Sequence, residues 1–207
     1  MSTDRRNQLV TGAIDLIATR GIRALTHRAL DTALELPPGS TSYYFRTRHA
    51  LIAAVADGIT ARSRADFATL HDITQSGESA GQRTVRPDPA EIAHGIAGWL
   101  ARPLTHRRNE LIARHALLIE VLGDTELHAR LAGSLFSLDR ATELFDTLGA
   151  TDPAATAGDF LALLEGLVFD RFAGVRAGLP ATIEQLSGPV SQFLHNAGRD
   201  YSQPNSE

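Results

Sequence analysis

The chain has 207 residues, with 24 acidic residues, 20 basic residues and a formal net charge of −4. This length suits one small module plus one larger domain, or a single continuous helical body. The absence of cysteine excludes disulfides and thiolate metal sites. No apolar run reaches the roughly 18 residues of a membrane span, and the opening MSTDRRNQ has no apolar signal-peptide core. We therefore expect a cytoplasmic protein without a membrane segment.

The first predicted helix covers residues 4–20. Its apolar residues recur at helical spacing and share one face: Leu9, Ala13, Ile14 and Ile17. Gly21 follows directly and favours the end of the helix, because glycine readily adopts the left-handed conformation found there.

Residues 24–51 predict two short helices joined by a tight turn. Thr26 is the expected N-cap of the first, with Leu25 and Leu30 forming a hydrophobic staple around it. The second is predicted over residues 38–44, beginning at Pro38, whose fixed φ suits the first helical position. It is rich in small and hydrogen-bonding side chains, which suits a recognition helix that enters the major groove of DNA.

This segment resembles the N-terminal signature of the TetR family of bacterial transcriptional regulators. The positions in register are Leu25, Thr26, Leu30, Leu36, Gly39, Ser40, Tyr44, Phe45, Arg48 and Leu51. The chain departs from the pattern at Glu35, which replaces the turn glycine, at Pro37, which replaces an N-cap serine, and at Ser42, which replaces a tyrosine. A left-handed conformation at Glu35 would carry a strain of about 1 kcal/mol.

The resemblance implies an all-α protein with about nine helices. A helix-turn-helix DNA-binding domain is expected over residues 1–50, followed by a helical effector-binding and dimerisation domain over residues 51–207. The charge distribution agrees, since residues 1–50 carry seven Arg and four acids (+3) and the remainder thirteen Arg and twenty acids (−7). A basic head on an acidic body is typical of a nucleic-acid reader. When bound to DNA, the protein would be associated with the bacterial nucleoid.

Individual roles follow for the DNA-binding residues. Arg28 is a candidate for a bidentate contact to guanine, with a solvated or phosphate-paired arginine as the alternative. Ser40 and Tyr43 are candidates for base edges, and Gly39 is expected to offer N–H groups to a phosphate. The remaining candidates concern the phosphate backbone and the shape of the recognition helix: Thr26, His27, Pro38, Ser42, Tyr44 and Arg48. The pattern predicts that His27 is exposed, with a solvated side chain favoured over a phosphate contact. Phe45 is expected in the core.

Beyond the head, Thr47 is predicted to cap a helix over residues 48–71, and residues 73–88 are predicted to form a polar loop. A helix is expected from Pro89 to Arg102, ended by Pro103. Further helices are predicted over residues 105–122, from Asp124 or Thr125 to near Gly149, over 152–177 and over 181–197.

The helix over residues 152–177 is apolar around nearly its whole circumference. Such a helix is buried on all sides or shared with a partner. With the helix over residues 181–197, it is predicted to form a two-fold four-helix homodimer interface. A core within a single chain is the alternative.

A small, largely apolar effector is expected to bind inside the helical body. His115 and Glu165 interrupt apolar stripes, which is costly unless a partner or a ligand satisfies them. Trp99, Phe136 and Phe169 are candidates for the aromatic wall of the pocket. Alternatively, His115 and Glu165 are satisfied core or interface residues.

No catalytic or nucleotide-binding motif is present, and the eight His show no ligand spacing on a helix. The sequence thus predicts no enzyme, no cofactor and no metal. The favoured function is a transcriptional regulator, with a repressor preferred to an activator, that leaves a palindromic operator in double-stranded DNA when an effector binds. A helical adaptor without DNA binding and a metal-dependent helical hydrolase are the alternatives.

Overall fold

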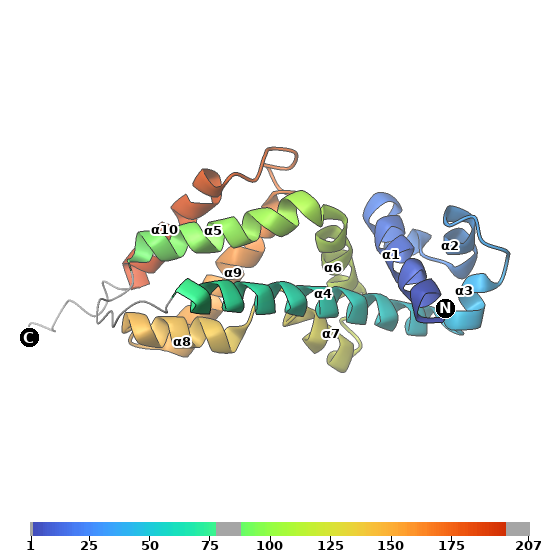
Figure 1. The fold of residues 1–207 in the computed structure, drawn as a ribbon, viewed down its shortest axis with the longest axis horizontal. Helices are drawn as coiled ribbons and strands as arrows, with labels where there is room; N and C mark the ends of the chain where they lie inside the picture. Colours follow the sequence, from blue (N-terminus) through green and yellow to red (C-terminus); the bar gives the residue numbers. More distant parts are fainter. Residues whose placement is uncertain (1, 78–87, 198–207) are drawn as a thin grey trace, which may run out of the picture. The chain divides into compact units, whose positions relative to one another are not determined.

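The computed structural model describes residues 2–77 and 88–197, with the side chains of residues 2–3 and 66–77 left aside. Within these ranges the chain forms ten α-helices and one 3-10 turn, without a strand (Figure 1). The all-α prediction is confirmed. The helices are α1 (Ser2–Arg20), α2 (His27–Ala33), α3 (Ser40–Tyr44), α4 (Arg48–Gly77), α5 (Pro89–His106), α6 (Arg108–Glu120), α7 (Thr125–Ala132), α8 (Leu138–Leu148), α9 (Pro153–Asp170) and α10 (Ile183–Ala197), with the 3-10 turn η1 at Ile22–Ala24.

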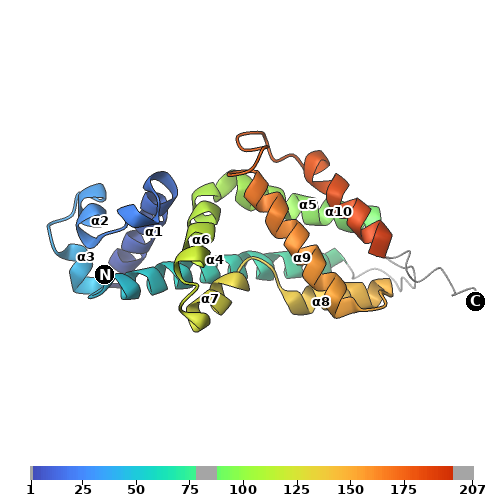
Figure 2. The same ribbon diagram turned by 180° about the vertical axis from the view of Figure 1, so that it is seen from behind.

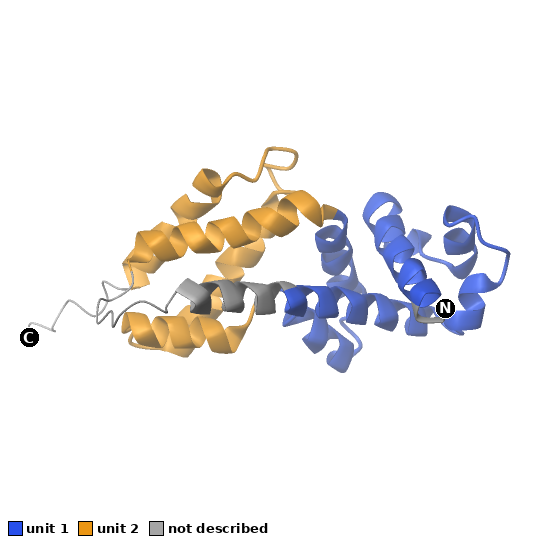
Figure 3. Cartoon of the chain, in the orientation of Figure 1, with its two compact units in different colours: residues 1–81, 109–135 blue, residues 82–108, 136–207 orange. Residues whose placement is uncertain are grey.

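The chain divides into two compact units (Figure 3). Unit 1 comprises residues 1–81 and 109–135, and unit 2 comprises residues 82–108 and 136–207. Unit 1 therefore contains the N-terminal helices together with α7 and nearly all of α6. None of the helices in the described part of the chain is long and apolar enough to cross a membrane.

Unit 1 is built around one apolar core. The predicted apolar face of α1 is buried there, with Leu9, Ala13, Ile14 and Ile17 all at most 3% exposed. Leu25, Leu30 and Phe45 from the short helices join the same cluster, as do apolar residues of α4, α6 and α7. Burial of these side chains contributes on the order of 1.5–3 kcal/mol each. The core therefore fixes α2 and α3 against α1 and α4.

Unit 2 consists of α5, α8, α9 and α10 (Figure 2). α5 packs along α10 and α8 along α9, with a smaller contact between α9 and α10. Three phenylalanines join α8, α9 and α10, with ring centroids 5.2 Å apart for Phe145 and Phe160 and 5.3 Å for Phe160 and Phe193. Aromatic pairs at these distances add to the stabilisation that burial provides.

Several predicted boundaries were wrong. Pro103 does not end α5, which continues to His106 with Pro103 buried inside it; proline removes one helical hydrogen bond, but burial in the core offsets that loss. The helix predicted from Asp124 to near Gly149 is two helices. α7 ends at Ala132, and the Ser137 side chain starts α8 by accepting the Arg140 N–H at 3.3 Å.

The helix predicted to extend to Ala177 ends at Asp170, and residues 171–177 form turns. The backbone at residue 174 passes so close to Asp170 that only glycine fits, because a Cβ there would lie 2.6 Å from the Asp170 Cα. α4 continues to Gly77, so residues 73–77 of the predicted loop are helical. Residues 78–87 of that loop lie outside the described ranges.

Candidate nucleic-acid interface

α2 begins as predicted. The Thr26 hydroxyl oxygen accepts the Ala29 N–H at 3.1 Å and thereby caps the helix. Leu25 and Leu30, which flank the cap, are fully buried, in agreement with a hydrophobic staple. α2 ends at Ala33, and its cap Leu34 donates its N–H to the Leu30 carbonyl at 3.1 Å.

The turn after α2 contains a strained residue. Glu35 has a φ of 53°, and it is the sole non-glycine residue with positive φ in the part of the chain that the structure describes. Glu35 therefore adopts the left-handed conformation at the position where the TetR signature has glycine. L-residues there carry a cost of about 1–2 kcal/mol.

α3 begins later than predicted. The N-cap is Gly39, with a φ of 92°, and the helix covers Ser40–Tyr44. Pro38 is therefore not the first helical residue but part of the turn. Since a φ near +90° is accessible mainly to glycine, the entrance to α3 is set by Gly39 and not by Pro38 or Pro37.

Asp31 fastens the turn to α3. Its Oδ1 accepts both the Thr41 N–H at 2.8 Å and the Thr41 hydroxyl at 2.6 Å, while its Oδ2 accepts the Gly39 N–H at 2.8 Å. Asp31 is 4% exposed and Thr41 is fully buried. Burial alone raises the pKa of Asp31, but these hydrogen bonds outweigh it and hold the pKa below the usual 3.8.

Sequence reasoning missed Asp31, and it assigned the Gly39 N–H wrongly. That N–H is donated to Asp31 and is not free for a phosphate. The sequence did contain one signal for this contact. Asp31 is an acidic residue near the end of α2, and the following helix α3 has no side-chain cap of its own for its first N–H groups.

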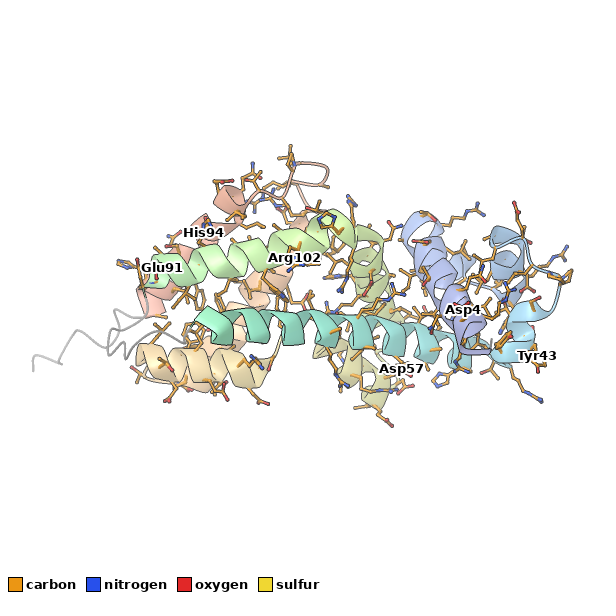
Figure 4. The ribbon with its side chains drawn as sticks, in the orientation of Figure 1. Asp4, Tyr43, Asp57, Glu91, His94 and Arg102 are labelled. Carbon is orange, nitrogen blue, oxygen red and sulfur yellow. The ribbon has the colours of Figure 1, made fainter. Side chains whose placement is uncertain are left out.

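The outer face of α3 is polar and aromatic. Tyr43 is 80% exposed and projects from the helix (Figure 4), and Ser42 is also exposed. Ser40 is half-buried and donates its hydroxyl to the Pro37 carbonyl at 2.6 Å. Tyr44 is half-buried against the core and stacks edge-on with Tyr43, with ring centroids 5.1 Å apart. The described helix therefore presents Ser42 and Tyr43 to the solvent.

Two residues of α2 flank this surface. Arg28 is exposed, as a base or phosphate contact requires. His27 was expected to be exposed but is half-buried, with its Nε2 2.7 Å from the Phe45 carbonyl oxygen. This hydrogen bond ties α2 to the end of α3. Phe45 itself is 1% exposed, which confirms its core assignment.

The N-terminus of α4 completes the head. Thr47 caps α4 by accepting the Ala50 N–H at 3.0 Å, as predicted. Arg48 donates through Nη1 to the Glu120 carboxylate at 2.5 Å and through Nη2 to the Ile22 carbonyl at 3.2 Å. A phosphate contact by Arg48 would therefore compete with Glu120 at the end of α6, a pairing that sequence reasoning did not identify.

The candidate effector residues are divided between the two units. In unit 2, Trp99 and Phe136 form an edge-on pair with ring centroids 5.4 Å apart. Glu165 is half-buried, whereas Phe169 is 47% exposed. In unit 1, His115 is half-buried, with its Nδ1 2.8 Å from the Leu111 carbonyl oxygen. The structure thus brings Trp99 and Phe136 together.

A family model described as "Tetracyclin repressor-like, C-terminal domain" matches residues 87–199, more than half of the chain. The chain belongs to the TetR family. Its N-terminal residues carry the helix-turn-helix described above, and the matched segment covers α5 to α10. This TetR-family protein is accordingly a DNA-binding transcriptional regulator.

Solved structures share the fold at low sequence identity. A TetR-family member from Streptomyces coelicolor A3 is 20% identical, with a TM-score of 0.66 over 91% of this chain and 97% of its own. A transcriptional regulator from Saccharomonospora viridis in complex with choline is 15% identical, with a TM-score of 0.68 over 93% and 96%. The multidrug binding protein EbrR complexed with ethidium is 20% identical, with a TM-score of 0.59 over 91% and 98%. None of the curated proteins matches the chain.

Proposed function

We propose that this TetR-family regulator is a repressor that binds a palindromic operator as a homodimer and leaves it when a small molecule binds. The observation that carries the proposal is the anchorage of α3 by Asp31. Because Thr41 and Gly39 are fixed by one buried carboxylate, the outward residues of α3 are held in place before DNA arrives. Such preorganisation lowers the cost of ordering the interface upon binding.

The base contacts are assigned to exposed residues on α2 and α3. Tyr43 is 80% exposed on α3, and its hydroxyl can donate a hydrogen bond to a base edge or accept one from it. The free lone pairs of Ser40 can accept, since its hydrogen is given to Pro37. Arg28 offers the planar fork that matches guanine in the major groove.

Phosphate contacts are assigned to the margins of this surface. Thr26 uses an oxygen lone pair to cap α2 and retains its hydroxyl hydrogen for a phosphate. Tyr44, Ser42 and the ring of His27 lie on the same short helices. Arg48 would turn from Glu120 toward a phosphate, exchanging one charge-assisted hydrogen bond for another.

The homodimer is assigned to α9 and α10. α9 buries Phe160, Leu164, Leu167 and Val168 within its own chain. A second stripe of α9 is exposed and uncharged along its length: Ala155, Gly158, Ala162, Gly166 and Phe169. Small residues allow two helices to approach closely, and Phe169 adds an apolar anchor. A two-fold axis would pair this stripe with its copy.

The effector is assigned to unit 2, around Trp99, Phe136 and Glu165. Phe169, which the dimer stripe also contains, and His115, which lies in unit 1, are separate further candidates. Choline and ethidium, found in two of the structural relatives, are both organic cations. An aromatic pair and a carboxylate suit a ligand of that charge. The proposed role is regulatory and cytoplasmic, with no catalytic step.

A mobility-shift assay on the DNA that flanks the protein's own gene tests the proposal. We expect a retarded band that the same unlabelled DNA removes but random DNA does not. A Tyr43→Ala, Arg28→Ala double variant should lose this discrimination and retain the fold. Retardation by random DNA alone, or no retardation at all, would contradict the regulator assignment and favour a helical adaptor.

A further inference from the structure

A cavity of about 360 Å³ lies in unit 2, outside the residues assigned to the operator and to the effector. Its wall combines the end of α5, the start of α6, the last turn after α9 and the segment before α10: Leu104, Thr105, Arg108, Arg171, Gly178, Leu179, Pro180, Ala181 and Thr182. This volume lies within the range of small-molecule sites. Its two cationic side chains, Arg108 and Arg171, distinguish it from an ordinary apolar pocket.

Arg171 is unusual because it is charged and buried. It is 4% exposed, and its Nη1 donates to the Pro180 carbonyl at 3.1 Å and to the Gln185 amide oxygen at 2.8 Å. Its Nε and Nη2 have no hydrogen-bond partner among the described residues. A guanidinium keeps its charge in proteins, and a buried donor without an acceptor is costly.

The two unpartnered nitrogens form one edge of the guanidinium. Nε–H and the neighbouring Nη2–H point in parallel, and this fork binds a carboxylate or a phosphate through two hydrogen bonds. Nη1, on the other side, is held by protein groups. The side chain is thus fixed with its anion-binding edge unsatisfied.

Within the described ranges, no acidic residue lines the cavity beside this charge. Burial raises the pKa of the adjacent Asp170, but hydrogen bonds from Arg176 and the positive charges of Arg176 and Arg171 outweigh it and hold that pKa below its usual range. Backbone hydrogen bonding and the Thr182 hydroxyl lower the pKa of Glu184, whose carboxylate does not line the cavity. The two wall segments, residues 102–108 and 171–182, contain five Arg and no acidic residue. This concentration occurs in a body, residues 51–207, whose formal charge is −7.

We propose that this cavity binds the oxyanion group, carboxylate or phosphate, of a small molecule. Arg171 supplies the bidentate fork, Arg108 supplies a second positive charge at the wall, and the Thr105 and Thr182 side chains line the same space. Residues 171–182 form turns and irregular backbone rather than a helix. Because Nε and Nη2 of Arg171 are buried, this wall must shift for the anion to reach them. The inference rests on no part of the proposed DNA function.

Isothermal titration calorimetry of the full chain without DNA tests the site. Sodium acetate and inorganic phosphate are the two probes, each at constant ionic strength set with chloride. We expect saturable binding of at least one probe and a saturable rise in Tm of about 2–4 °C. Preference for acetate assigns a carboxylate ligand, and preference for phosphate assigns a phosphorylated one.

Three variants locate the binding. Arg171→Lys keeps the charge but removes the fork, and it should weaken binding at least tenfold. Arg108→Gln should weaken it several-fold and leaves Arg171 and its hydrogen bonds in place, so it serves if the Arg171 variant does not fold. The matched control is Arg102→Gln, since Arg102 is exposed on α5 and does not line the cavity (Figure 4). Absence of saturable binding by both probes, unchanged affinity in Arg108→Gln and Arg171→Lys, or equal loss in Arg102→Gln would overturn the site.

Discussion

Asp31 and Thr41 are joined by two hydrogen bonds to the same carboxylate oxygen, from the Thr41 N–H at 2.8 Å and from its hydroxyl at 2.6 Å. Asp31 lies in α2 and Thr41 in the first turn of α3. The contact therefore acts as a side-chain cap for α3 that comes from the preceding helix. Asp31 and Thr41 are both buried, so the same contact stabilises the DNA-binding helices and fixes the position of α3.

Asp31→Ala should lower the free energy of unfolding by about 2–3 kcal/mol, because it leaves the buried N–H and hydroxyl of Thr41 without an acceptor. Urea denaturation followed by circular dichroism measures this. Asp57→Ala is the matched control: Asp57 is an exposed partner of Arg130 at 2.8 Å, and such a pair contributes less than about 1 kcal/mol. Equal losses in the two variants would contradict the anchoring role.

The same carboxylate predicts a pH dependence. Its pKa is lowered in the folded protein relative to 3.8, so its stabilisation is fully present above that value and is lost as the pH falls through the folded pKa. The stability difference between wild type and Asp31→Ala should stay constant from pH 7 to about pH 5 and shrink below pH 3.8. A difference that instead grows upon acidification would show that Asp31 stabilises the head in its protonated form.

Glu35→Gly should stabilise the protein by up to about 1 kcal/mol. Glycine relieves the left-handed strain at a φ of 53°, although its flexible unfolded chain offsets part of the gain. Gly39→Ala in the same turn should destabilise the protein, because a φ of 92° is unfavourable for alanine. A Cβ there would meet no atom within 4 Å, so the loss measures backbone strain and not a steric clash. Thermal unfolding of both variants checks the pair. Destabilisation by Glu35→Gly would mean that the Glu35 side chain makes a favourable contact.

The sequence predicted those features of the head that depend on local pattern. Thr26 and Thr47 cap helices and Phe45 is buried, as predicted. These features could be predicted because helix caps and apolar spacing depend on residues that are close in the sequence. Contacts across long sequence separations were missed, such as Arg48 with Glu120, 72 residues apart. The interruption of a helix within an apolar stretch was also missed. Leu135 and Phe136 are buried in the link between α7 and α8, so the apolar pattern there resembled that of one continuous helix.

Two arginines separate base recognition from phosphate recognition. Arg28→Ala should cost about 1–3 kcal/mol on the operator and relax preference at one base pair, whereas Arg48→Ala should weaken operator and random DNA alike. Glu120→Gln releases Arg48 from its 2.5 Å ion pair and should strengthen binding to both DNAs. Fluorescence anisotropy at fixed salt measures all three. Equal losses on the two DNAs for Arg28→Ala would remove the base contact.

The dimer assignment predicts a mass in solution of twice the 22.3 kDa of one chain, measured by light scattering at micromolar concentration without DNA. Gly166→Arg places a charge on the exposed stripe of α9, where a Cβ meets no atom within 4 Å, and should yield monomers. Asp146→Arg, on the exposed side of α8, is the matched control and should remain dimeric. A monomeric wild type would refute the dimer, and a dimeric Gly166→Arg would place the interface elsewhere.

The effector assignment can be tested through Trp99, which is the single tryptophan of the chain and stacks on Phe136 at 5.4 Å. Compounds that release the protein from its operator should change Trp99 fluorescence, and choline, the ligand of one structural relative, is the first to try. An effector acts only through a difference in affinity between the DNA-binding and released conformations. His115→Leu and Glu165→Leu should therefore alter the concentration needed for release without altering DNA affinity in its absence. Phe136→Leu should change the Trp99 emission of the free protein and serves as the control for local packing. Release at the wild-type concentration by the Glu165 variant would contradict the pocket assigned to unit 2, and the same result for the His115 variant would remove His115 as a candidate.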